Sequence, residues 1–289
     1  MKAIILAGGS GSRLYPATRV TSKMLLPVYD KPLIYYPMSF LIEAGIDNIL
    51  IISSPDQLDN FRFLFGDGNR LGISIEYTVQ EKAEGIAQAL LLAENFTCGD
   101  QVCLVLGDNV FFGGEVNKIF KQTLLDNIAA TVFAYPVRDP SRFGVVDIDC
   151  SGKAISLVEK PHFPKSNLAV PGVYIYDGNA VNIAKNLKKS DRGEYEITDV
   201  NLNYLERYEL QVVRLKENVN WYDAGTENSL MAVSNHIYEY QKFKNVLVGS
   251  PEQAAYKSGF IDHKQLELTI SNMPVNNYRE NLEKLLVST

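Results

Sequence analysis

Short runs of apolar residues alternate with longer segments of mixed polarity along the first half of the chain. The apolar runs predict buried strands at residues 2–7, 48–53, 73–77, 102–106 and 130–135. Apolar positions at helical spacing predict helices over residues 31–45, with Pro32 in the first turn and Gly45 at the end, and over residues 55–65. Because strands that alternate with helices are joined by right-handed crossovers, we expect a parallel sheet with helices on both faces.

The pattern changes from Phe143 onward. Apolar positions over residues 145–148 and 154–158 flank the sequence Cys150-Ser151-Gly152-Lys153, which predicts a β-hairpin with a glycine turn. A strand at residues 169–176, a helix at 197–208 capped by Thr198, and a last apolar strand at 210–215 are expected to follow. Beyond Thr226 the pattern predicts only helices, at residues 227–243, 252–256, 262–268 and 276–286.

These segments divide the chain into a core and an appendage. We expect a core over residues 1–225, with one half at about 1–135 and the other at about 136–225, and a C-terminal helical extension over residues 226–289. The sheet is complete without the extension, so its apolar residues suggest a contact with another subunit; they include Leu230, Ile237, Leu282, Leu285 and Leu286.

The bulk composition narrows the class of protein. Apolar residues make up 46% of the 289 residues and charged residues 21%, which is ordinary for a soluble globular protein. A net charge of -6 argues against a nucleic-acid-binding surface, which needs a basic stripe. The three cysteines lack metal or disulfide spacing and are expected to be small buried residues. We find no signal peptide or membrane-spanning run, so we expect a cytoplasmic protein without membrane contact.

A glycine-rich loop follows the first strand and carries the first chemical signal. Gly8, Gly9 and Gly11 allow backbone N–H groups to approach an anion closely, and Arg13 and Lys23 add positive charge just beyond them. The spacing fits neither a Walker loop, since no Gly-Lys-Ser/Thr occurs, nor the dinucleotide fingerprint, since Leu14 replaces its third glycine. The loop therefore predicts another kind of polyphosphate site, with a plain strand-to-helix turn as the alternative.

Two aspartates far apart in the sequence follow apolar segments. The most apolar run, residues 102–106, ends in Gly107-Asp108-Asn109, and ligands of parallel sheets bind beyond the carboxyl ends of strands. Asp223 follows Trp221 and Tyr222 near the end of the core. Carboxylates at such positions suit a metal-bound phosphate, with a helix cap or a turn as the alternative role for Asp108.

The motifs together resemble those of the sugar-1-phosphate nucleotidyltransferases. The resemblance rests on Leu-Ala-Gly-Gly-Ser-Gly-Ser-Arg-Leu-Tyr-Pro-Ala-Thr at residues 6–18 and Ser-Lys-Met-Leu-Leu-Pro at residues 22–27. Gly107-Asp108-Asn109, Glu159-Lys160-Pro161, Glu196-Ile197-Thr198-Asp199 and the sequence from Trp221 to Thr226 follow in the expected order. Within this family the chain is most similar to members that use dTTP and glucose 1-phosphate.

This resemblance implies a fold, a reaction and a site. The fold is α/β, a Rossmann-like, mostly parallel mixed sheet with helices on both faces, a small sugar-binding β excursion and the helical appendage. The reaction joins dTTP and glucose 1-phosphate to dTDP-glucose and pyrophosphate, in deoxysugar nucleotide biosynthesis, with Mg²⁺ as cofactor and a homotetramer as the assembly. Catalysis is assigned to Arg13, Lys23, Lys160 and Asp108, and the metal to Asp108 and Asp223.

The resemblance also assigns the binding residues. The nucleotide is assigned to Leu6, Gly8, Gly9, Gly11, Ser12, Arg13, Lys23, Gln80, Gly85 and Asp108, with Gln80 and Gly85 at the edge of the base. The sugar is assigned to Asn109, Phe143, Gly144, Glu159, Lys160, Val170, Gly172, Tyr174 and Trp221. On residue type alone, Gln80 is a solvated loop residue and Glu159-Lys160 an exposed ion pair, so both roles depend on the resemblance.

The chain departs from the family pattern at three places. Met24 stands where glutamine is usual, Lys82-Ala83-Glu84 replaces Ser-Pro-Asp, and Phe143 replaces tyrosine. None removes a charge that the transfer needs, but each could alter the substrates. The alternatives are therefore a nucleotidyltransferase for UTP or another hexose 1-phosphate, and a sugar-nucleotide sensor without turnover.

Overall fold

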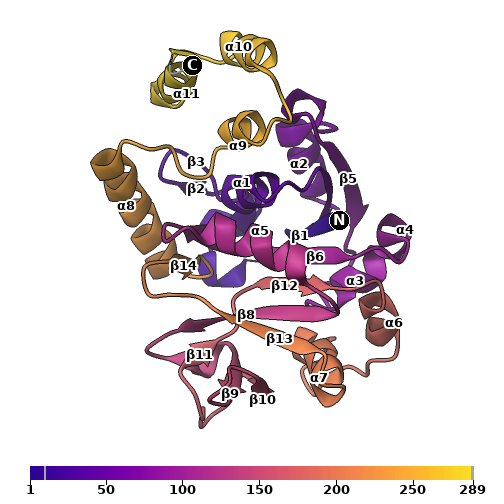
Figure 1. The fold of residues 1–289 in the computed structure, drawn as a ribbon. Coiled ribbons are helices and arrows are strands. Elements are labelled where there is room, and N and C mark those ends of the chain that lie inside the picture. The colour runs from indigo at the N-terminus through magenta and orange to yellow at the C-terminus, as the bar shows by residue number, and fades with distance from the viewer. Residues whose placement is uncertain (10, 288–289) are drawn as a thin grey trace.

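A mixed sheet forms the centre of the molecule. The computed structural model describes residues 1–9 and 11–287. A ten-stranded sheet runs in the order β10-β9-β11-β8-β12-β6-β1-β4-β5, with β13 paired to β8 (Figure 1). Its parallel part is formed by β5 (Ser74–Val79), β4 (Asn48–Ser53), β1 (Lys2–Leu6) and β6 (Val102–Leu106).

The second half of the sheet adds antiparallel strands. β12 (Val173–Tyr176) lies antiparallel between β6 and β8, whereas β13 runs parallel to β8. At the bottom of Figure 1 the sheet ends in a small antiparallel group, β11, β9 and β10. The bounds of these strands are β8 (Ala130–Pro136), β9 (Gly144–Ile148), β10 (Ala154–Glu159), β11 (Leu168–Ala169) and β13 (Leu210–Arg214).

Helices cover both faces because the sheet is apolar on both. Along β1, Ala3 and Ile5 belong to one core cluster and Ile4 and Leu6 to the other, as the alternation of a strand requires. The first cluster is completed by α1 (Tyr35–Glu43), α2 (Leu58–Phe65) and α5 (Val116–Asp126). The second is completed by α3 (Gln88–Leu92), α6 (Ala180–Lys185) and α7 (Ile197–Glu206), while α4 (Glu94–Thr97) follows α3.

The helices after residue 226 pack on the first face. α8 (Glu227–Lys244) begins with a capping box formed by Thr226 and Ser229. α9 (Pro251–Lys257) packs on α1, and α10 (His263–Ser271) and α11 (Asn277–Val287) lie above it at the top of Figure 1. No helix in the described ranges is both long and apolar enough to cross a membrane.

Several predicted bounds are wrong for identifiable reasons. The helix expected from residue 31 begins at Tyr35, because β3 (Lys31–Pro32) instead pairs with β2 (Pro27–Val28) in a hairpin. The strand expected over 169–176 is broken between β11 and β12, where Pro171 and Gly172 interrupt the pairing.

Other differences concern roles and missed elements. β13 is not the last strand, since β14 (Asn220–Asp223) pairs with β7 (Asn109–Phe112), and neither β7 nor α5 was predicted. Glu196, not Thr198, is the residue that precedes α7 as its N-cap. Cys98 and Cys150 are exposed, and only Cys103 is buried as expected. The remaining short elements are single 3-10 turns at Ser12–Leu14, Ala17–Arg19, Lys23–Leu25, Asn69–Leu71 and Pro140–Arg142.

Candidate functional site

A cavity of about 560 Å³ opens at the carboxyl ends of β1 and β6, the place where parallel sheets bind ligands. It unites most of the site residues predicted from the sequence, although they come from segments far apart in the chain. They are Gly9, Gly11, Ser12, Arg13, Lys23, Asp108, Asn109, Phe143, Gly144, Glu159, Lys160, Val170, Gly172, Tyr174, Trp221 and Asp223.

The glycine loop follows β1 and contributes Gly9 and Gly11 to the cavity wall. Gly9 and Gly11 have φ of 100° and 58°, a backbone region that favours glycine. A Cβ on Gly11 would also lie 2.8 Å from Cγ2 of Thr18, whose hydroxyl donates to the Gly11 carbonyl over 2.8 Å. The loop then enters the turn Ser12–Leu14, which places Arg13 at the cavity wall.

Lys23 reaches the cavity from its own short turn. The Ser22 hydroxyl accepts from the backbone N–H of Met24 over 3.2 Å and so caps the turn Lys23–Leu25. The Lys23 ammonium forms an ion pair with Asp108, directly beyond the end of β6. Met24 points away into the core, where its sulfur faces Gly107, so its departure from the family pattern lies beneath the cavity.

Pairing of two short strands brings the two aspartates together. β14 runs antiparallel to β7 with Asp223 opposite Asn109, and the Ala224 N–H donates to the Asp108 carbonyl over 2.9 Å. Burial, and then the charge of Asp108, raise the pKa of Asp223 to about 6, although nearby Lys23, Arg142 and Arg13 oppose the rise. The raised pKa reflects two carboxylates that share one partly buried place.

This pair fits a hard divalent cation. Such ions prefer carboxylate oxygens and complete their coordination with phosphate oxygens and water. Within the described residues no group of three or more histidine, cysteine, aspartate or glutamate side chains could hold a metal by itself. A metal at Asp108 and Asp223 would therefore need oxygens from a bound phosphate.

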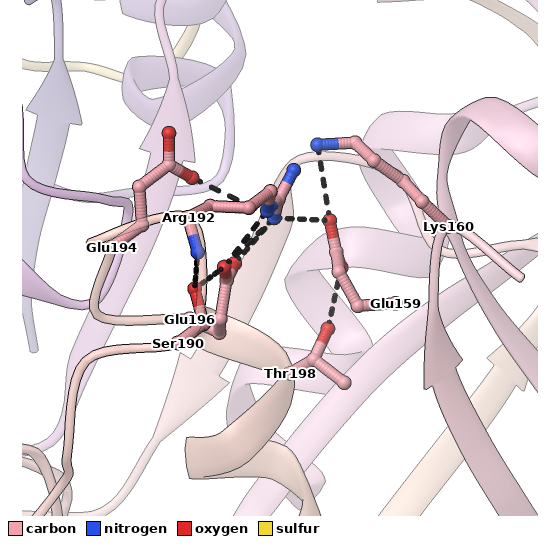
Figure 2. Close-up of polar contacts among 7 residues, drawn as sticks. All are labelled: Glu159, Lys160, Ser190, Arg192, Glu194, Glu196 and Thr198. Carbon is pink, nitrogen blue, oxygen red and sulfur yellow. Dashed lines mark hydrogen bonds and ion pairs between the residues drawn. The ribbon is translucent and has the colours of Figure 1, made fainter.

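Glu159 stands at the centre of the polar contacts on the other side of the cavity (Figure 2). The Thr198 hydroxyl donates to one of its oxygens over 2.7 Å, while Lys160 and Arg192 approach the other at 3.2 and 3.4 Å. Lys160 has a φ of 42°, an uncommon conformation for a residue other than glycine. The Glu159-Lys160 pair is thus part of a network rather than an isolated exposed ion pair.

Asn109 lies between the aspartate side and the Glu159 side of the cavity. Its side-chain oxygen accepts from the Gly172 N–H over 2.9 Å and from the Trp221 indole over 2.7 Å, and its NH₂ donates to Asp108 over 3.0 Å. The Trp221 ring in turn lies 5.1 Å from the ring of Phe143. Asn109, which the sequence assigned to the sugar, therefore holds three neighbouring residues of the cavity in position through its side-chain hydrogen bonds.

The remaining predicted residues line an adjoining hollow of about 260 Å³, which shares Gly9, Glu159 and Lys160 with the main cavity. Gln80 is 4% exposed, and its NH₂ donates to Gln88 over 2.8 Å. A Cβ on Gly8 would collide with the side-chain oxygen of Gln80, so a larger residue there would displace the end of the Gln80 side chain. The hollow is lined by Leu6, Gly8, Gln80 and Gly85, among others.

The sequence did not reveal every charged residue of the site. Arg142 and Arg192 also line the two cavities, and Thr198 was predicted only as a cap. Arg142 lies directly before Phe143, and Arg192 lies shortly before the Glu196-Ile197-Thr198-Asp199 motif. Their closeness to recognised motifs was the available signal, but isolated arginines carry no spacing pattern of their own.

Fold and site together define an α/β protein with a glycine-rich loop and a carboxylate pair at the carboxyl ends of its parallel strands. A protein-family model described as nucleotidyl transferase matches residues 2–240. The chain belongs to this family, so it is a nucleotidyltransferase enzyme. Enzymes of the family generally use a divalent metal ion.

Curated relatives match the chain over almost its whole length. It is 48% identical over 286 residues to the glucose-1-phosphate thymidylyltransferase of Neisseria meningitidis serogroup A, covering 99% of both chains. It is 46% identical over 287 residues to the enzyme of the same name from Mycolicibacterium smegmatis, again with 99% of both covered.

A solved structure gives the same result for the fold. The structure of a provisionally assigned glucose-1-phosphate thymidylyltransferase from Bacillus anthracis aligns with a TM-score of 0.76 and 43% identity, over 82% of this chain and 94% of that one. The mixed α/β fold expected from the sequence is thus confirmed.

Proposed function

We propose that the enzyme transfers a thymidylyl group from dTTP to α-D-glucose 1-phosphate and forms dTDP-glucose and pyrophosphate. The relatives named glucose-1-phosphate thymidylyltransferase support this choice of substrates. The observation that carries it is one cavity that unites the glycine loop, the cations Arg13 and Lys23, and the carboxylates Asp108 and Asp223. The product would supply deoxysugar nucleotide synthesis in the cytoplasm.

The reaction mainly requires that the two substrates are positioned and that their negative charges are neutralised. A sugar phosphate is already an anion at neutral pH, so its oxygen can attack the α-phosphorus of the triphosphate without a general base. The obstacle is repulsion between the two anions, which fixed cations reduce. Pyrophosphate then leaves on the side opposite the attacking oxygen.

In this proposal each cation binds a different phosphate group. Arg13 holds the β- and γ-phosphates and the departing pyrophosphate, Lys23 neutralises the α-phosphate, and Lys160 holds the phosphate of the sugar. Asp108 and Asp223 would hold Mg²⁺, which supplies further neutralisation of the triphosphate.

The binding of the base and the sugar follows from the same cavities. Gln80 and Gly85, in the adjoining hollow, would lie along the edge of the thymine. Glu159 would accept from hydroxyl groups of the glucose, with its carboxylate already oriented by Thr198. Residues 1–135 then form a nucleotide half and residues 136–225 a sugar half, with the helical extension outside the chemistry.

A pyrophosphate-release assay over several substrates tests the proposal. We expect release with dTTP and glucose 1-phosphate in the presence of Mg²⁺, and weaker release with UTP, because a single extra hydroxyl is rejected by about 100-fold or less in a pocket that does not bond it. Faster turnover with ATP or GTP, or with another hexose 1-phosphate, would overturn the assignment of substrates. Absence of release with every pair would favour a sensor without turnover.

A further inference from the structure

Three carboxylates surround the guanidinium of Arg192, and they differ in their contacts (Figure 2). Glu159 and Glu194 lie 3.4 and 3.6 Å from Nη2 of the arginine. Glu196 accepts from Nη2 with both oxygens over 2.8 Å, and from Nε over 3.2 Å. Glu196 is therefore the main partner of Arg192 among the three.

Glu196 directly precedes a helix that is anchored in the core, whereas Arg192 lies in the loop before it. The residues after Glu196, Ile197 and Thr198, are each 4% exposed and begin helix α7, which is anchored in the core. The Ser190 hydroxyl also donates to Glu196 over 2.7 Å. The Arg192 side chain is 42% exposed, against 11% for Glu196, and comes from the loop before this helix, so the carboxylate restricts a long side chain that has many rotamers.

The geometry brings two cations together where the two cavities adjoin, since Lys160 lines both of them and Arg192 lines the smaller one. Lys160 and Arg192 both approach the same oxygen of Glu159, at 3.2 and 3.4 Å. Two cationic groups that both contact one carboxylate oxygen are close enough to contact one phosphate group together. Burial alone would lower the pKa of Arg192, but the hydrogen bonds and charge of Glu196 outweigh it and raise the pKa, so the arginine stays charged.

We infer that Glu196 is a positioning residue that holds Arg192 beside Lys160, where the two cations receive the phosphate of the sugar 1-phosphate. The inference rests on the proposed function for the identity of that substrate. Glu196 itself does not touch the substrate in this account; it acts through the arginine. Its effect must therefore depend on the presence of Arg192.

Glu196→Gln tests this, with Glu194→Gln as the matched control, because Glu194 approaches the same guanidinium from a more exposed position. We expect Glu196→Gln to raise KM for glucose 1-phosphate about tenfold, the scale of one charge-assisted hydrogen bond, and to leave KM for dTTP within about twofold. Glu194→Gln should leave both KM values within about twofold. A rise of both KM values in Glu196→Gln, or an equal effect of the control, would overturn the inference.

A double-mutant cycle separates positioning from a purely structural role. In an Arg192→Gln background, Glu196→Gln should change KM for glucose 1-phosphate no further, since residues that act as a unit are non-additive. A structural role predicts instead that Glu196→Gln lowers the midpoint of thermal unfolding and raises KM by the same factor in both backgrounds.

Calorimetric binding of glucose 1-phosphate keeps this test distinct from that of the proposed function. The titration uses enzyme saturated with dTTP in the presence of EDTA, so that no turnover occurs. Weakened binding of glucose 1-phosphate in Glu196→Gln but not in Glu194→Gln would support the inference. If the wild-type enzyme forms no dTDP-glucose, that result contradicts the proposed function and leaves the inference supported. Equal binding by wild type and Glu196→Gln, or no binding by wild type, would contradict the inference.

Discussion

Asp223 and Asp108 belong to one electrostatic unit, although more than a hundred residues of chain separate them. The pairing of β14 with β7 sets them side by side, and Lys23 forms an ion pair with Asp108. Two carboxylates that share a partly buried place repel each other unless a cation lies between them. This pair is therefore the most direct point at which to test the proposed metal site.

Replacement of either aspartate by asparagine keeps the shape and removes a negative charge. We expect Asp223→Asn and Asp108→Asn each to lower kcat/KM by about two orders of magnitude or more, the scale of losing one preorganised electrostatic element. The double variant should lose much less than the product of the single losses. Turnover and dependence on divalent metal can be measured by pyrophosphate release; unchanged values in Asp223→Asn would contradict the two-aspartate site.

The raised pKa of Asp223 also predicts how stability depends on pH in metal-free protein. Its pKa is about 6 in the folded chain against 3.8 for a free side chain, so the folded state binds more protons between these values and stability falls as pH rises through them. Asp223→Asn removes this penalty. We expect it to raise the midpoint of thermal unfolding at pH 8 by about 2–4 °C, the effect of about 1 kcal/mol in a protein of this size, and by less near pH 5.

Differential scanning calorimetry in EDTA measures this difference. Asp59→Asn, at an exposed position of α2, is the control and should show no such trend. A destabilised Asp223→Asn at pH 8 would show that the carboxylate is held by favourable contacts rather than tolerated at a cost.

The sequence was informative where a residue lay in a motif and silent where its role depends on tertiary contacts. Every residue predicted for the site lines one of the two adjoining cavities. Their individual roles stay predictions. The bracing contacts of Asn109 and the carboxylates around Arg192 arise from segments that only the fold brings together, so no local pattern could have indicated them.

At the scale of elements, the glycine loop and the loop after β5 depend on each other. Gly8 leaves room for the side-chain oxygen of Gln80, and Gln80 is held by Gln88 from the start of α3. The strand bounds 48–53 and 102–106 agree with the prediction, because continuous apolar runs are buried on both faces. The start of α1 was missed because a hairpin at residues 27–32 has no such periodicity.

Gly8→Ala tests the dependence between the two loops. The added methyl group must displace the flexible end of Gln80, so we expect KM for dTTP to rise about tenfold, the scale of one lost hydrogen bond, with KM for glucose 1-phosphate nearly unchanged. Gln80→Ala should give a similar rise, and Gly8→Ala should add little to it. Steady-state kinetics of the three variants provide the measurement; a normal KM for dTTP in Gln80→Ala would rule out its role at the base.

At the scale of the whole molecule, the C-terminal helices serve first as part of the chain's own core. Ile237 and Leu282 are fully buried, and the partly buried Leu230, Leu285 and Leu286 pack against the same core, so the apolar character of these residues already serves the packing of the single chain. Exposed apolar side chains do occur on α8, where Met231 and Phe243 are 67% and 83% exposed. Met231 and Phe243 of α8 are therefore apolar side chains of this extension that a second subunit could cover.

The homotetramer remains a prediction, and it can be tested without any substrate. We expect multi-angle light scattering at micromolar concentration to give a mass about four times that of the chain, because burial of exposed apolar residues favours association. Replacement of Met231 and Phe243 by glutamate should lower the mass if α8 lies at a contact, whereas glutamate at exposed Phe63 of α2 should not. A monomer in the wild type would contradict the prediction.

Phosphorus NMR of the complete reaction tests the central claim most directly. With dTTP, glucose 1-phosphate and Mg²⁺, we expect the sugar phosphate signal to disappear while a nucleotide diphosphate-sugar and pyrophosphate appear in equal amounts, and no conversion once EDTA removes the metal. Added pyrophosphate should reverse the reaction and restore dTTP. Release of phosphate or pyrophosphate from dTTP without formation of a sugar nucleotide would contradict the account.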